Sequence, residues 1–463
     1  MRSFADRERS SHDAAATNVF THDSAELNGI ATHLVNAALR RGASDAVARA
    51  SESDQLAVTV RNARAESLQH SRTQGVTLTV YHGQRSGTAS SSDLSPAALA
   101  ATVESAWHIA QYSGVDPCAG PADAGMLESA PQNLDLFHPW DVSADTAIEL
   151  AQRAESAARH FDKTIVNSRG ASVSAHHGQF ALATSQGFLG GYADSFHSLN
   201  CSVIAGNENG MQTGHWGTVR RVSTELDSPE ATGRRAAEQA SLMLDARRLP
   251  TGTWPVLFDA RIAAPLVLTL VAAVSGEALY RKQGFLPGSL GQRVLADHLS
   301  LLESAHELCG LASAPFDHDG VRTGTRDVVR DGVLQGYFLS TYAGRKLGMT
   351  STGFAGGPHN LCLRSSRTEP TDDLHAMLRR LDRGLFVTHL LGQGVNLLTG
   401  DYSRGAAGFW VENGVIQYPV QEVTIASNLK DMLRHIVALG ADVHLTGLRT
   451  GSILIEAMRV AGI

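Results

Sequence analysis

The sequence predicts an α+β protein in two parts. The first part is an N-terminal α/β region with helices packed on mixed or antiparallel strands, and the second is a C-terminal domain that is mainly an antiparallel twisted sheet or an open barrel. Short β-branched runs that alternate between apolar and polar residues predict the strands. Serine residues that precede proline or an apolar-periodic segment predict capped helices. Two turns in the C-terminal half, Asp331-Gly332 and Asn413-Gly414, separate apolar runs and therefore predict hairpins.

Changes in composition divide the chain into a tail and two domains. The tail mixes acidic and basic side chains and lacks the apolar run of a secretory signal, so we expect it to be flexible. A connector rich in Pro, Gly and Ala at 115–125 interrupts the first domain. The predicted boundaries are 1–26 for the tail, 27–245 for the N-terminal domain with sub-segments of about 27–113 and 140–245, and 250–463 for the C-terminal domain.

The first sub-segment has the pattern helix, strand, hairpin, helix. The β-branched alternating runs at 56–60 and 75–83 are typical of strands. Ser95 is placed to cap a helix whose first residue is Pro96, where the missing N–H of proline costs nothing.

The second sub-segment begins with a helix from near Ser143 to about His160. Residues 164–222 follow the pattern of a β-meander, since "HHG", "SQG" and "NENG" separate the alternating runs as turns. The vicinal pair His176-His177 is therefore expected in a turn beside Gly178. Ser228, followed by proline, announces another helix that ends near 246–250.

The C-terminal domain opens with a strand at 254–259 and then a run without charge. From Ile262 to Ser275 there are fourteen residues with no charged side chain, no His and no Cys, which predicts a buried helix. Beyond it, hairpins at 328–340 and 408–420 and a strand near 452–460 indicate a predominantly antiparallel sheet.

The bulk composition excludes several classes of protein. The net charge is −7 and the chain has no cluster of Lys or Arg, which argues against direct nucleic-acid binding. The longest apolar run is shorter than the roughly 20 residues that a membrane span needs. The four cysteines lie far apart without a CxxC spacing, so we expect free thiols and a cytoplasmic location.

Most local motifs lack a residue or a spacing that the corresponding functional site needs. His306 begins "HELCG", but Gly310 stands where a zincin needs its second imidazole. The acidic turn at 317–320 lacks the later Glu of a calcium loop, and the glycines at 392–397 lack the third position of a dinucleotide fingerprint. In "GDYSRG" (400–405) an extra residue breaks the nucleophile-elbow spacing, which leaves a binding loop or a structural turn.

Several long stretches resemble one known family. They include "SGEALYRKQGFLPGSLGQRVL" (275–295), "STGFAGGPHN" (351–360) and "LDLFHPW" (134–140). Together with "PFDHDGVRTGTRDVVRDGVLQGYFLSTYAGRKLGM" (315–349) and "GQGVNLLTGDYSRGAAGFWVENGVIQYPV" (392–420), these stretches resemble the TldD/TldE family in its TldE (PmbA) branch. The resemblance runs from about residue 27 to the end of the chain.

The resemblance implies a cytoplasmic heterodimer in which a TldD and a TldE subunit enclose a cavity. The complex is expected to be a zinc metalloprotease that acts on unfolded or extended peptides, including peptide-antibiotic precursors and antitoxins. In the TldD branch an HExxxH helix and a C-terminal Cys hold the zinc, and the Glu acts as general base.

The zinc helix of the TldD branch corresponds to about 267–273 in this chain. No residue from Arg261 to Gly276 is His, Glu, Asp or Cys, and no Cys follows Cys362. We therefore expect no metal and no catalytic residue in this subunit, and zinc in its TldD-like partner. The chain could form a homodimer when that partner is missing, and we expect no contact with a membrane or with nucleic acid.

The resemblance also suggests where a peptide substrate would lie. An extended peptide can pair its backbone with an exposed strand, which tolerates many sequences. The loop Gly400–Gly405 is the first candidate for the lining of that path, and the Gly-rich turn near Gly356-Gly357 is a weaker one. The candidate substrate-cavity residues are Asn396, Asp401, Tyr402, Ser403, Arg404, Gly356 and Gly357.

Two other functions remain open from the sequence. A self-sufficient metallopeptidase would need ligands such as His176, His177, His359 or His389, none of which has a recognisable metal-binding spacing. A regulator of DNA gyrase would correspond to another of the family's names, but the acidic balance of the chain argues against direct DNA contact.

Overall fold

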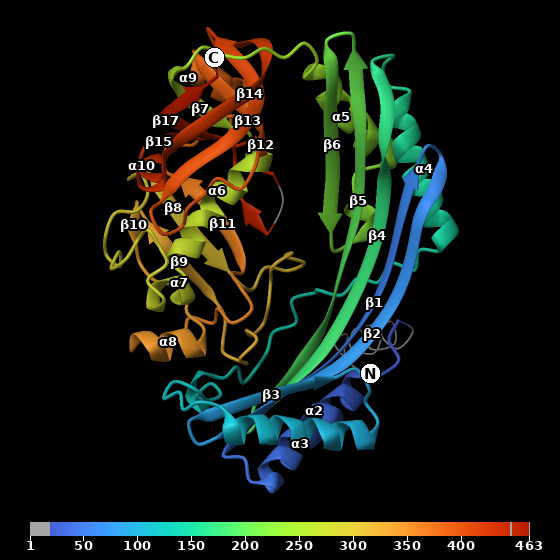
Figure 1. Ribbon diagram of the computed structural model, residues 1–463, viewed down its shortest axis with the longest axis vertical. Helices are drawn as coiled ribbons and strands as arrows, with labels where there is room; N and C mark the ends of the chain where they lie inside the picture. The colour runs from blue at the N-terminus through green and yellow to red at the C-terminus, as the bar shows by residue number, and fades with distance from the viewer. Residues whose placement is uncertain (1–18, 445–446, 463) are drawn as a thin grey trace, which may run out of the picture.

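The computed structural model describes residues 19–444 and 447–462 and has the predicted α+β fold. Figure 1 shows two halves side by side, a long curved sheet with its helices and a rounder C-terminal half. The expected tail at 1–26 falls mostly outside the described residues, but Ser24 already belongs to a helix, so any tail ends before it. No helix in the described ranges is long and apolar enough to span a membrane.

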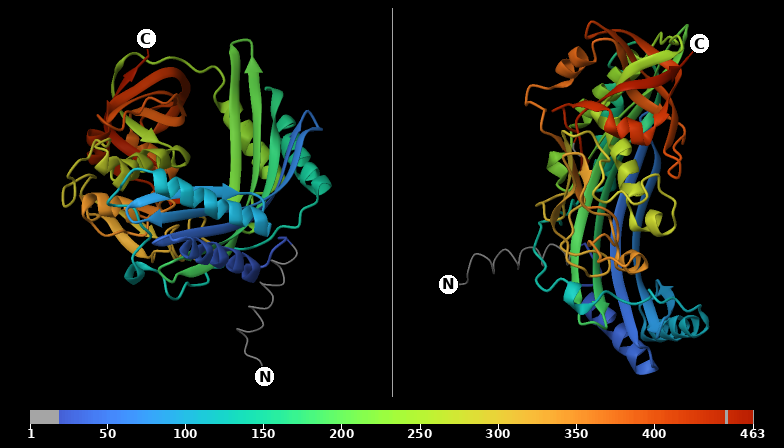
Figure 2. Two further views of the ribbon diagram at one scale, coloured as in Figure 1. Left: turned by 60° about the horizontal axis from the view of Figure 1, so that its bottom comes forward. Right: turned by 90° about the vertical axis from the view of Figure 1, so that its left-hand side faces the viewer.

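The N-terminal half is one antiparallel sheet in the order β3-β2-β1-β4-β5-β6. Its long strands run along most of the length of the molecule (Figure 2). The strands are β1 (Asp45–Arg61), β2 (Arg64–His82), β3 (Arg85–Ser91), β4 (Ile165–Thr184), β5 (Leu189–Asn207) and β6 (Gly210–Arg220).

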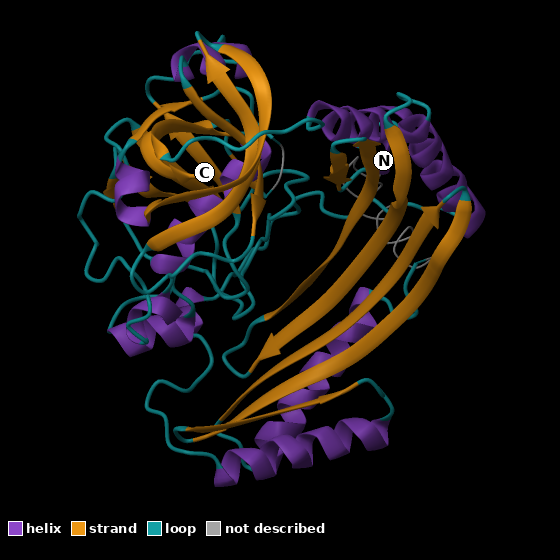
Figure 3. Ribbon diagram, turned by 45° about the horizontal axis from the view of Figure 1, so that its top comes forward, coloured by secondary structure: helices purple, strands orange, loops and turns teal. Residues whose placement is uncertain are grey.

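Two pairs of helices cover one face of this sheet at its two ends (Figure 3). Every second residue of β1 faces this side. Ala46, Ala48 and Ala50 pack under the first helix pair, and the stretch Leu56–Val60 packs under the second. The first pair is α2 (Ser24–Arg41) and α3 (Pro96–Tyr112), and the second is α4 (Ala144–Arg159) and α5 (Pro229–Leu242).

The cap predicted at Ser95 is confirmed, and the helices expected to start near Ser143 and Ser228 also begin with serine caps. The side chains of Ser95, Ser143 and Ser228 each accept a hydrogen bond from the backbone N–H three residues later. The signals at Ser95, Ser143 and Ser228 therefore located three helix starts to within a residue.

The C-terminal half contains a small barrel. Its sheet runs β14-β13-β12-β7-β17-β15, and a further pairing of β14 with β17 closes the first five strands into a ring. The strands are β7 (Gly252–Phe258), β12 (Gly384–Leu391), β13 (Asp401–Glu412), β14 (Val415–Asn428), β15 (Ile436–Leu439) and β17 (Ile453–Ala461). The ring is mixed, because β7 and β12 are parallel while the other pairs are antiparallel.

A second sheet in the same half has the order β10-β9-β8-β11-β16. Its strands are β8 (Leu299–Ser304), β9 (Thr325–Arg330), β10 (Val333–Leu334), β11 (Asn360–Ser365) and β16 (Leu448–Arg449). The remaining helices are α6 (Ala260–Ala273), α7 (Gly276–Tyr280), α8 (Thr341–Leu347), α9 (Leu374–Leu381) and α10 (Leu429–Arg434), with 3-10 turns η1 (Ala124–Met126) and η2 (Ser223–Glu225).

Both predicted hairpins are present, with Asp331-Gly332 and Asn413-Gly414 at their tips. The "HHG" turn is wrong, because His176, His177 and Gly178 lie within β4 and pair with both β1 and β5. Pairing on both sides makes a polar triplet part of a strand, even though its composition is typical of a turn.

The connector at 115–125 and helix α8 join the two halves. Arg345 donates to the carbonyl oxygens of Gly120 and Pro121 and pairs with Asp123. Lys346 pairs with Asp116 at 2.8 Å. These contacts tie the lower end of the C-terminal half to the N-terminal half.

Candidate functional site

Helix α6 is the predicted buried helix, and it carries no side chain that could hold a metal. It follows β7 directly, and Leu266, Val267 and Leu270 are buried in the C-terminal core. Asp259 precedes the helix, and both of its carboxylate oxygens bond the Arg261 guanidinium, at 2.8 and 2.9 Å. The zinc that the resemblance implies therefore does not fit this helix, because a divalent ion needs several N, O or S donors.

Polar side chains gather around Arg261 at the start of α6. The guanidinium lies 5.2 Å from the centre of the Trp216 ring. His215, His389 and His444 each have a pKa below the usual value, first because of burial and then because of the Arg261 charge. We call these five residues the Arg261 cluster. His215 and Trp216 lie in β6, whereas Arg261, His389 and His444 belong to the C-terminal half, so both halves of the molecule contribute to the cluster.

Gly356 and Gly357 line a pocket of about 320 Å³ beside the start of α7. Gly276, Tyr280 and Tyr342 line the same pocket. Both predicted glycines have a positive φ, 101° and 117°, which favours glycine. A side chain at 356 would also strike the His318 ring, 2.7 Å from the Cβ position. The pocket beside the end of α6 thus stays open because Gly356 and Gly357 have no side chains.

The stretch Gly400–Gly405 is not the loop that we expected, because β13 begins at Asp401. Tyr402 is only 3% exposed and packs in the core, where burial raises its pKa to about 12. Tyr402 is therefore wrong as a cavity residue. Asp401 and Ser403 point outward on either side of it, and Arg404 is half-buried.

Asn396 closes the turn before β13. Its side-chain oxygen accepts hydrogen bonds from the N–H groups of Leu398 and Thr399, and its N–H donates to the carbonyl of Asp401. The Asp401 carboxylate accepts from the Thr399 hydroxyl at 2.7 Å. These polar groups satisfy one another, which is typical of a structural turn.

His176 and His177 lie in strand β4 and make structural contacts within the N-terminal sheet. His177 is 5% exposed, and its Nε2 accepts a hydrogen bond from the N–H of Trp140 at 3.0 Å. Burial, together with the nearby His197, lowers the pKa of His177 to about 4. His176 stacks on Phe196 with ring centres 4.4 Å apart. Neighbouring residues of one strand point to opposite faces, so the two imidazoles do not converge on one ion.

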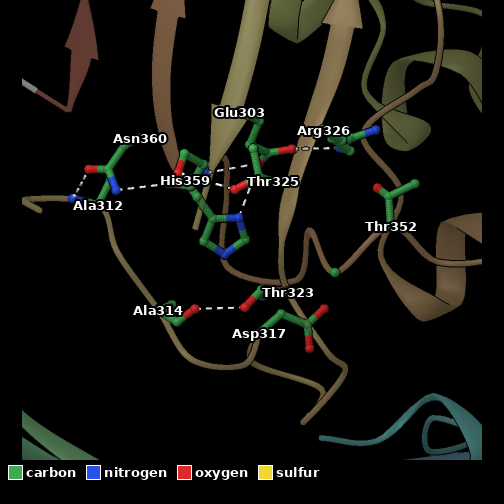
Figure 4. A network of polar contacts seen from close by, with 12 residues as sticks. Glu303, Ala312, Ala314, Asp317, Thr323, Thr325, Arg326, Thr352, His359 and Asn360 are labelled. Atoms are coloured by element: carbon green, nitrogen blue, oxygen red, sulfur yellow. Dashed lines mark hydrogen bonds and ion pairs between the residues drawn. The ribbon is translucent and has the colours of Figure 1, made fainter. Parts of the chain in front are cut away.

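His359 belongs to a buried ion-pair network (Figure 4). The backbone N–H of His359 donates a hydrogen bond to one carboxylate oxygen of Glu303 at 3.0 Å, and the ring Nδ1 of His359 lies 3.0 Å from the same oxygen. Arg326 pairs with the other carboxylate oxygen at 2.7 Å. Burial would raise the pKa of Glu303, but the hydrogen bonds and the Arg326 charge hold it below the usual value. His389 contacts the Thr388 hydroxyl. Neither histidine has the surroundings of a metal ligand.

Asp317 lies near the glycine turn and is almost fully buried. Burial and the nearby Asp319 raise its pKa to about 7. Its carboxylate accepts hydrogen bonds from the N–H groups of Asp319, Val321 and Ala355. These bonds hold the 317–321 turn against the Gly356 loop, so its evident role is structural.

One group of potential metal ligands occurs within 19–444 and 447–462, and sequence reasoning missed it. It comprises Asp135, His138 and Cys309, whose ligand atoms lie within 4.8 Å of one another. Burial, followed by the neighbouring Asp135, raises the pKa of the Cys309 thiol to about 11. Asp135 and His138 stand in "LDLFHPW" with a D-x-x-H spacing, which was a visible signal. Their third member is distant in sequence and could not be paired with them.

Three family models together match most of the chain. The one described as PmbA/TldA metallopeptidase domain 1 matches residues 46–110, and the central-domain model matches residues 137–244. The model described as the PmbA/TldA metallopeptidase C-terminal domain matches residues 251–462.

Individual proteins that are similar to this chain carry the same family name. The metalloprotease PmbA of Escherichia coli is 45% identical over 92% of this chain and 94% of its own length. A metalloprotease PmbA homolog of Haemophilus influenzae is 43% identical over 94% of this chain and 96% of its own. A crystal structure from Bacteroides thetaiotaomicron, described as a putative modulator of DNA gyrase, has the same fold with a TM-score of 0.89. It is 24% identical and covers 95% of this chain and 99% of its own.

Proposed function

This chain belongs to the PmbA/TldD metallopeptidase family, in its PmbA/TldE branch, and from that premise we propose that it shapes the substrate cavity of a heterodimeric zinc metalloprotease. In this proposal a TldD-like partner carries the catalytic zinc. The complex cleaves unfolded or extended peptides, such as peptide-antibiotic precursors and antitoxins. This chain supplies residues that line the substrate cavity and a strand edge that can pair with the peptide, and it supplies no general base.

The observation that carries the proposal is the chemistry of helix α6. Its side chains include no carboxylate, imidazole or thiol, and the nearby Asp259 is already engaged by Arg261. Peptide hydrolysis by zinc needs a polarised water and a base beside it. A helix of aliphatic and small side chains supplies neither, whatever the register of the match.

The free edge of β6 is a suitable docking edge for an extended peptide. It is the last strand of the N-terminal sheet and the one closest to the C-terminal half (Figure 1). A peptide added there would form main-chain hydrogen bonds without regard to most of its side chains. The Arg261 cluster lies beside this edge and offers an indole face, a guanidinium and imidazoles as contacts.

Of the seven residues predicted to line the substrate cavity, six remain in this proposal and one does not. Gly356 and Gly357 are retained as pocket walls, because they line the space at the start of α7. Asp401, Ser403 and Arg404 are retained as outward-facing or half-buried positions on β13, and Asn396 on the turn before it. Tyr402 is withdrawn because it is buried in the core.

The test is co-expression of this chain with a TldD-like protein of the same genome. We expect native mass measurement to find one copy of each chain, and the complex to hydrolyse an unstructured peptide that neither chain cleaves at the same rate alone. Replacing the partner's HExxxH glutamate with glutamine should abolish cleavage. A complex that forms but remains fully active with that partner variant would contradict the division of roles.

A matched change in this chain tests α6 itself. Thr269 carries a hydroxyl on that helix, and the hydroxyl donates to the carbonyl of Leu266 at 2.6 Å. Because that bond stays within the helix, Thr269→Val should leave the activity of the complex within about twofold of the wild type. A large loss of kcat at unchanged KM would show that α6 takes part in the chemistry.

A self-sufficient metallopeptidase is the second candidate, and the comparisons with metalloproteases favour it at the level of the family name. Its proposed ligands are dispersed, since His177 lies in β4 while His359 pairs with Glu303. Regulation of DNA gyrase is the third, and the net charge of −7 argues against direct DNA contact. Recovery of gyrase without a TldD-like chain in a pull-down would favour that reading.

A further inference from the structure

Asp135, His138 and Cys309 place an oxygen, a nitrogen and a sulfur atom close to one another. Cys309 Sγ lies 3.2 Å from Asp135 Oδ2 and 3.5 Å from His138 Nε2. The third side of the triangle, from His138 Nε2 to Asp135 Oδ2, is 3.3 Å. All three sides are therefore of similar length, with one sulfur, one nitrogen and one oxygen at the corners.

These separations match a tetrahedral zinc centre. Zinc–sulfur bonds are about 2.3 Å, and zinc–nitrogen and zinc–oxygen bonds are about 2.0–2.2 Å. At the tetrahedral angle those lengths place the ligand atoms about 3.3–3.6 Å apart. The observed sides of 3.2, 3.3 and 3.5 Å agree with these values to within a few tenths of an ångström.

The same geometry argues against a nucleophilic relay. In a Cys–His–Asp relay the thiol and the carboxylate use opposite nitrogens of the imidazole. Here the Cys309 thiol and the Asp135 carboxylate both lie near Nε2 of His138, at 3.5 and 3.3 Å, and the carbonyl oxygen of Asp135 lies 3.0 Å from the same nitrogen. Convergence on one nitrogen suits a shared ion, and it does not suit the transfer of a proton through the ring.

The two loops that carry the ligands are held together by other bonds. The N–H of Cys309 donates to the carbonyl of Leu134 at 2.9 Å, and the N–H of His138 donates to the Ser195 hydroxyl at 2.8 Å. The buried guanidinium of Arg221 donates to the carbonyls of Leu136 and Gly310. The triangle is thus preorganised by the protein.

Solvent can reach the cluster. The side chain of His138 is 25% exposed and that of Asp135 is 41% exposed, so an ion has a path of entry and room for a water as fourth ligand. Asp135 also lines a cavity of about 580 Å³ between the sheet, the 131–137 segment and Pro315. A thiolate with an imidazole and a carboxylate favours zinc-class ions over magnesium or calcium.

We infer that Asp135, His138 and Cys309 form a binding site for a single zinc-class divalent ion that links the 134–138 segment to the loop after β8. The site lies outside α6, and it revises the expectation that this subunit holds no metal. Its fourth position is open to water. In the site the ion fastens the N-terminal half to the C-terminal half through ligands 171 residues apart.

The test uses the untagged full chain, stripped with a chelator and titrated with Co²⁺ as a spectroscopic probe and then with Zn²⁺. We expect one equivalent of Co²⁺ to give a thiolate-to-cobalt charge-transfer band, which Zn²⁺ then displaces. Cys309→Ser should remove the band, and Asp135→Asn should weaken binding by about 10-fold or more. Cys362→Ala is the matched control, since Cys362 is also a half-buried free thiol in the C-terminal half.

Two outcomes would overturn the inference. Equal binding by the wild type and Cys309→Ser would assign the metal to other histidines. Absence of a thiolate band in a folded wild-type chain would leave a hydrogen-bonded cluster only. Near-UV circular dichroism of the apo variants establishes that they are folded. The experiment needs neither a partner nor a peptide, so its result is separate from that of the proposed function.

Discussion

Individual side chains in this protein show why residue type alone does not identify a site. The chain has 20 histidines, and the ones that looked like possible ligands serve the fold. His177 holds the N–H of Trp140, and His359 is one side of a buried ion pair. The cluster that we propose as a metal site contains a different histidine, His138, whose partner Cys309 is distant in the sequence.

The depressed pKa of His177 makes the folded state sensitive to acid. The pKa falls from 6.5 to about 4 on burial, so the unfolded chain binds the proton more readily than the folded one. Stability from this residue is therefore complete above about pH 6.5 and is lost as the pH falls toward about 4. The loss is of the order of 3 kcal/mol over that window.

His177→Gln removes this titration and keeps an oxygen that can accept from Trp140. We expect its free energy of unfolding in urea to fall less between pH 7 and pH 4.5 than that of the wild type. His33→Gln, the same change at an exposed position of α2, should keep the wild-type pH dependence. A His177→Gln protein that loses as much stability as the wild type would show that other groups dominate.

At the scale of the elements, close packing of helices depends on small residues. Helices α4 and α5 cross where Gly233 faces Ala154, and a Cβ at 233 would lie 2.0 Å from the Ala154 carbonyl oxygen. Overpacking of this kind typically costs about 1–3 kcal/mol. Gly29 in α2 has open space around it, so alanine there should stabilise its helix by roughly 0.5–1 kcal/mol.

Gly233→Ala and Gly29→Ala are therefore expected to have opposite effects. Thermal unfolding should show a lower Tm for the first and an equal or higher Tm for the second. Equal Tm values for the two variants would mean that α4 and α5 can separate without cost, which contradicts the packing described above.

Helix starts were predictable because a cap is a local interaction. Ser95, Ser143 and Ser228 satisfy backbone N–H groups of their own segments, so the sequence nearby contains the whole signal. Strand lengths were underestimated for the opposite reason. Residues 64–74 of β2 are largely exposed and do not alternate, and their strand conformation comes from pairing with β1. Glu52 and Asp54 interrupt β1 where neither helix pair covers it.

For the candidate site, the sequence alone established the side chains that helix α6 carries. The lack of donors on α6 could be established from the sequence, because no register of the match supplies one. The five-strand barrel closure and the triangle formed by Asp135, His138 and Cys309 depend on contacts between distant segments. Gly400–Gly405 was misjudged because glycine and polar residues also occur in strands whose edges or bulges need them.

At the scale of the whole molecule, one buried cation joins the two halves. Arg221 is 4% exposed, pairs with Asp194 and donates to the carbonyls of Ser195, Gly310 and Leu311. Lysine has three rotatable donors where arginine has a planar fork of five, so it cannot make this set of bonds.

Arg221→Lys should therefore loosen the contact between the halves. Hydrogen exchange is expected to rise in the 305–315 loop and in the 134–138 segment, with a loss of about 1–3 kcal/mol for carbonyls left without a donor. Arg220→Lys, at the neighbouring position, should leave the exchange of both segments unchanged. Unaltered exchange in Arg221→Lys would show that the halves are held by the α8 contacts instead.

We propose that this chain completes a peptidase without performing the hydrolysis. The most direct measurement is the rate at which the isolated chain, supplied with Zn²⁺, cleaves an unstructured peptide, followed by mass spectrometry. We predict no cleavage above the rate without protein, even when the chain has bound zinc, and cleavage once a TldD-like partner is added. Turnover by the isolated chain that a chelator abolishes and Zn²⁺ restores would contradict the account.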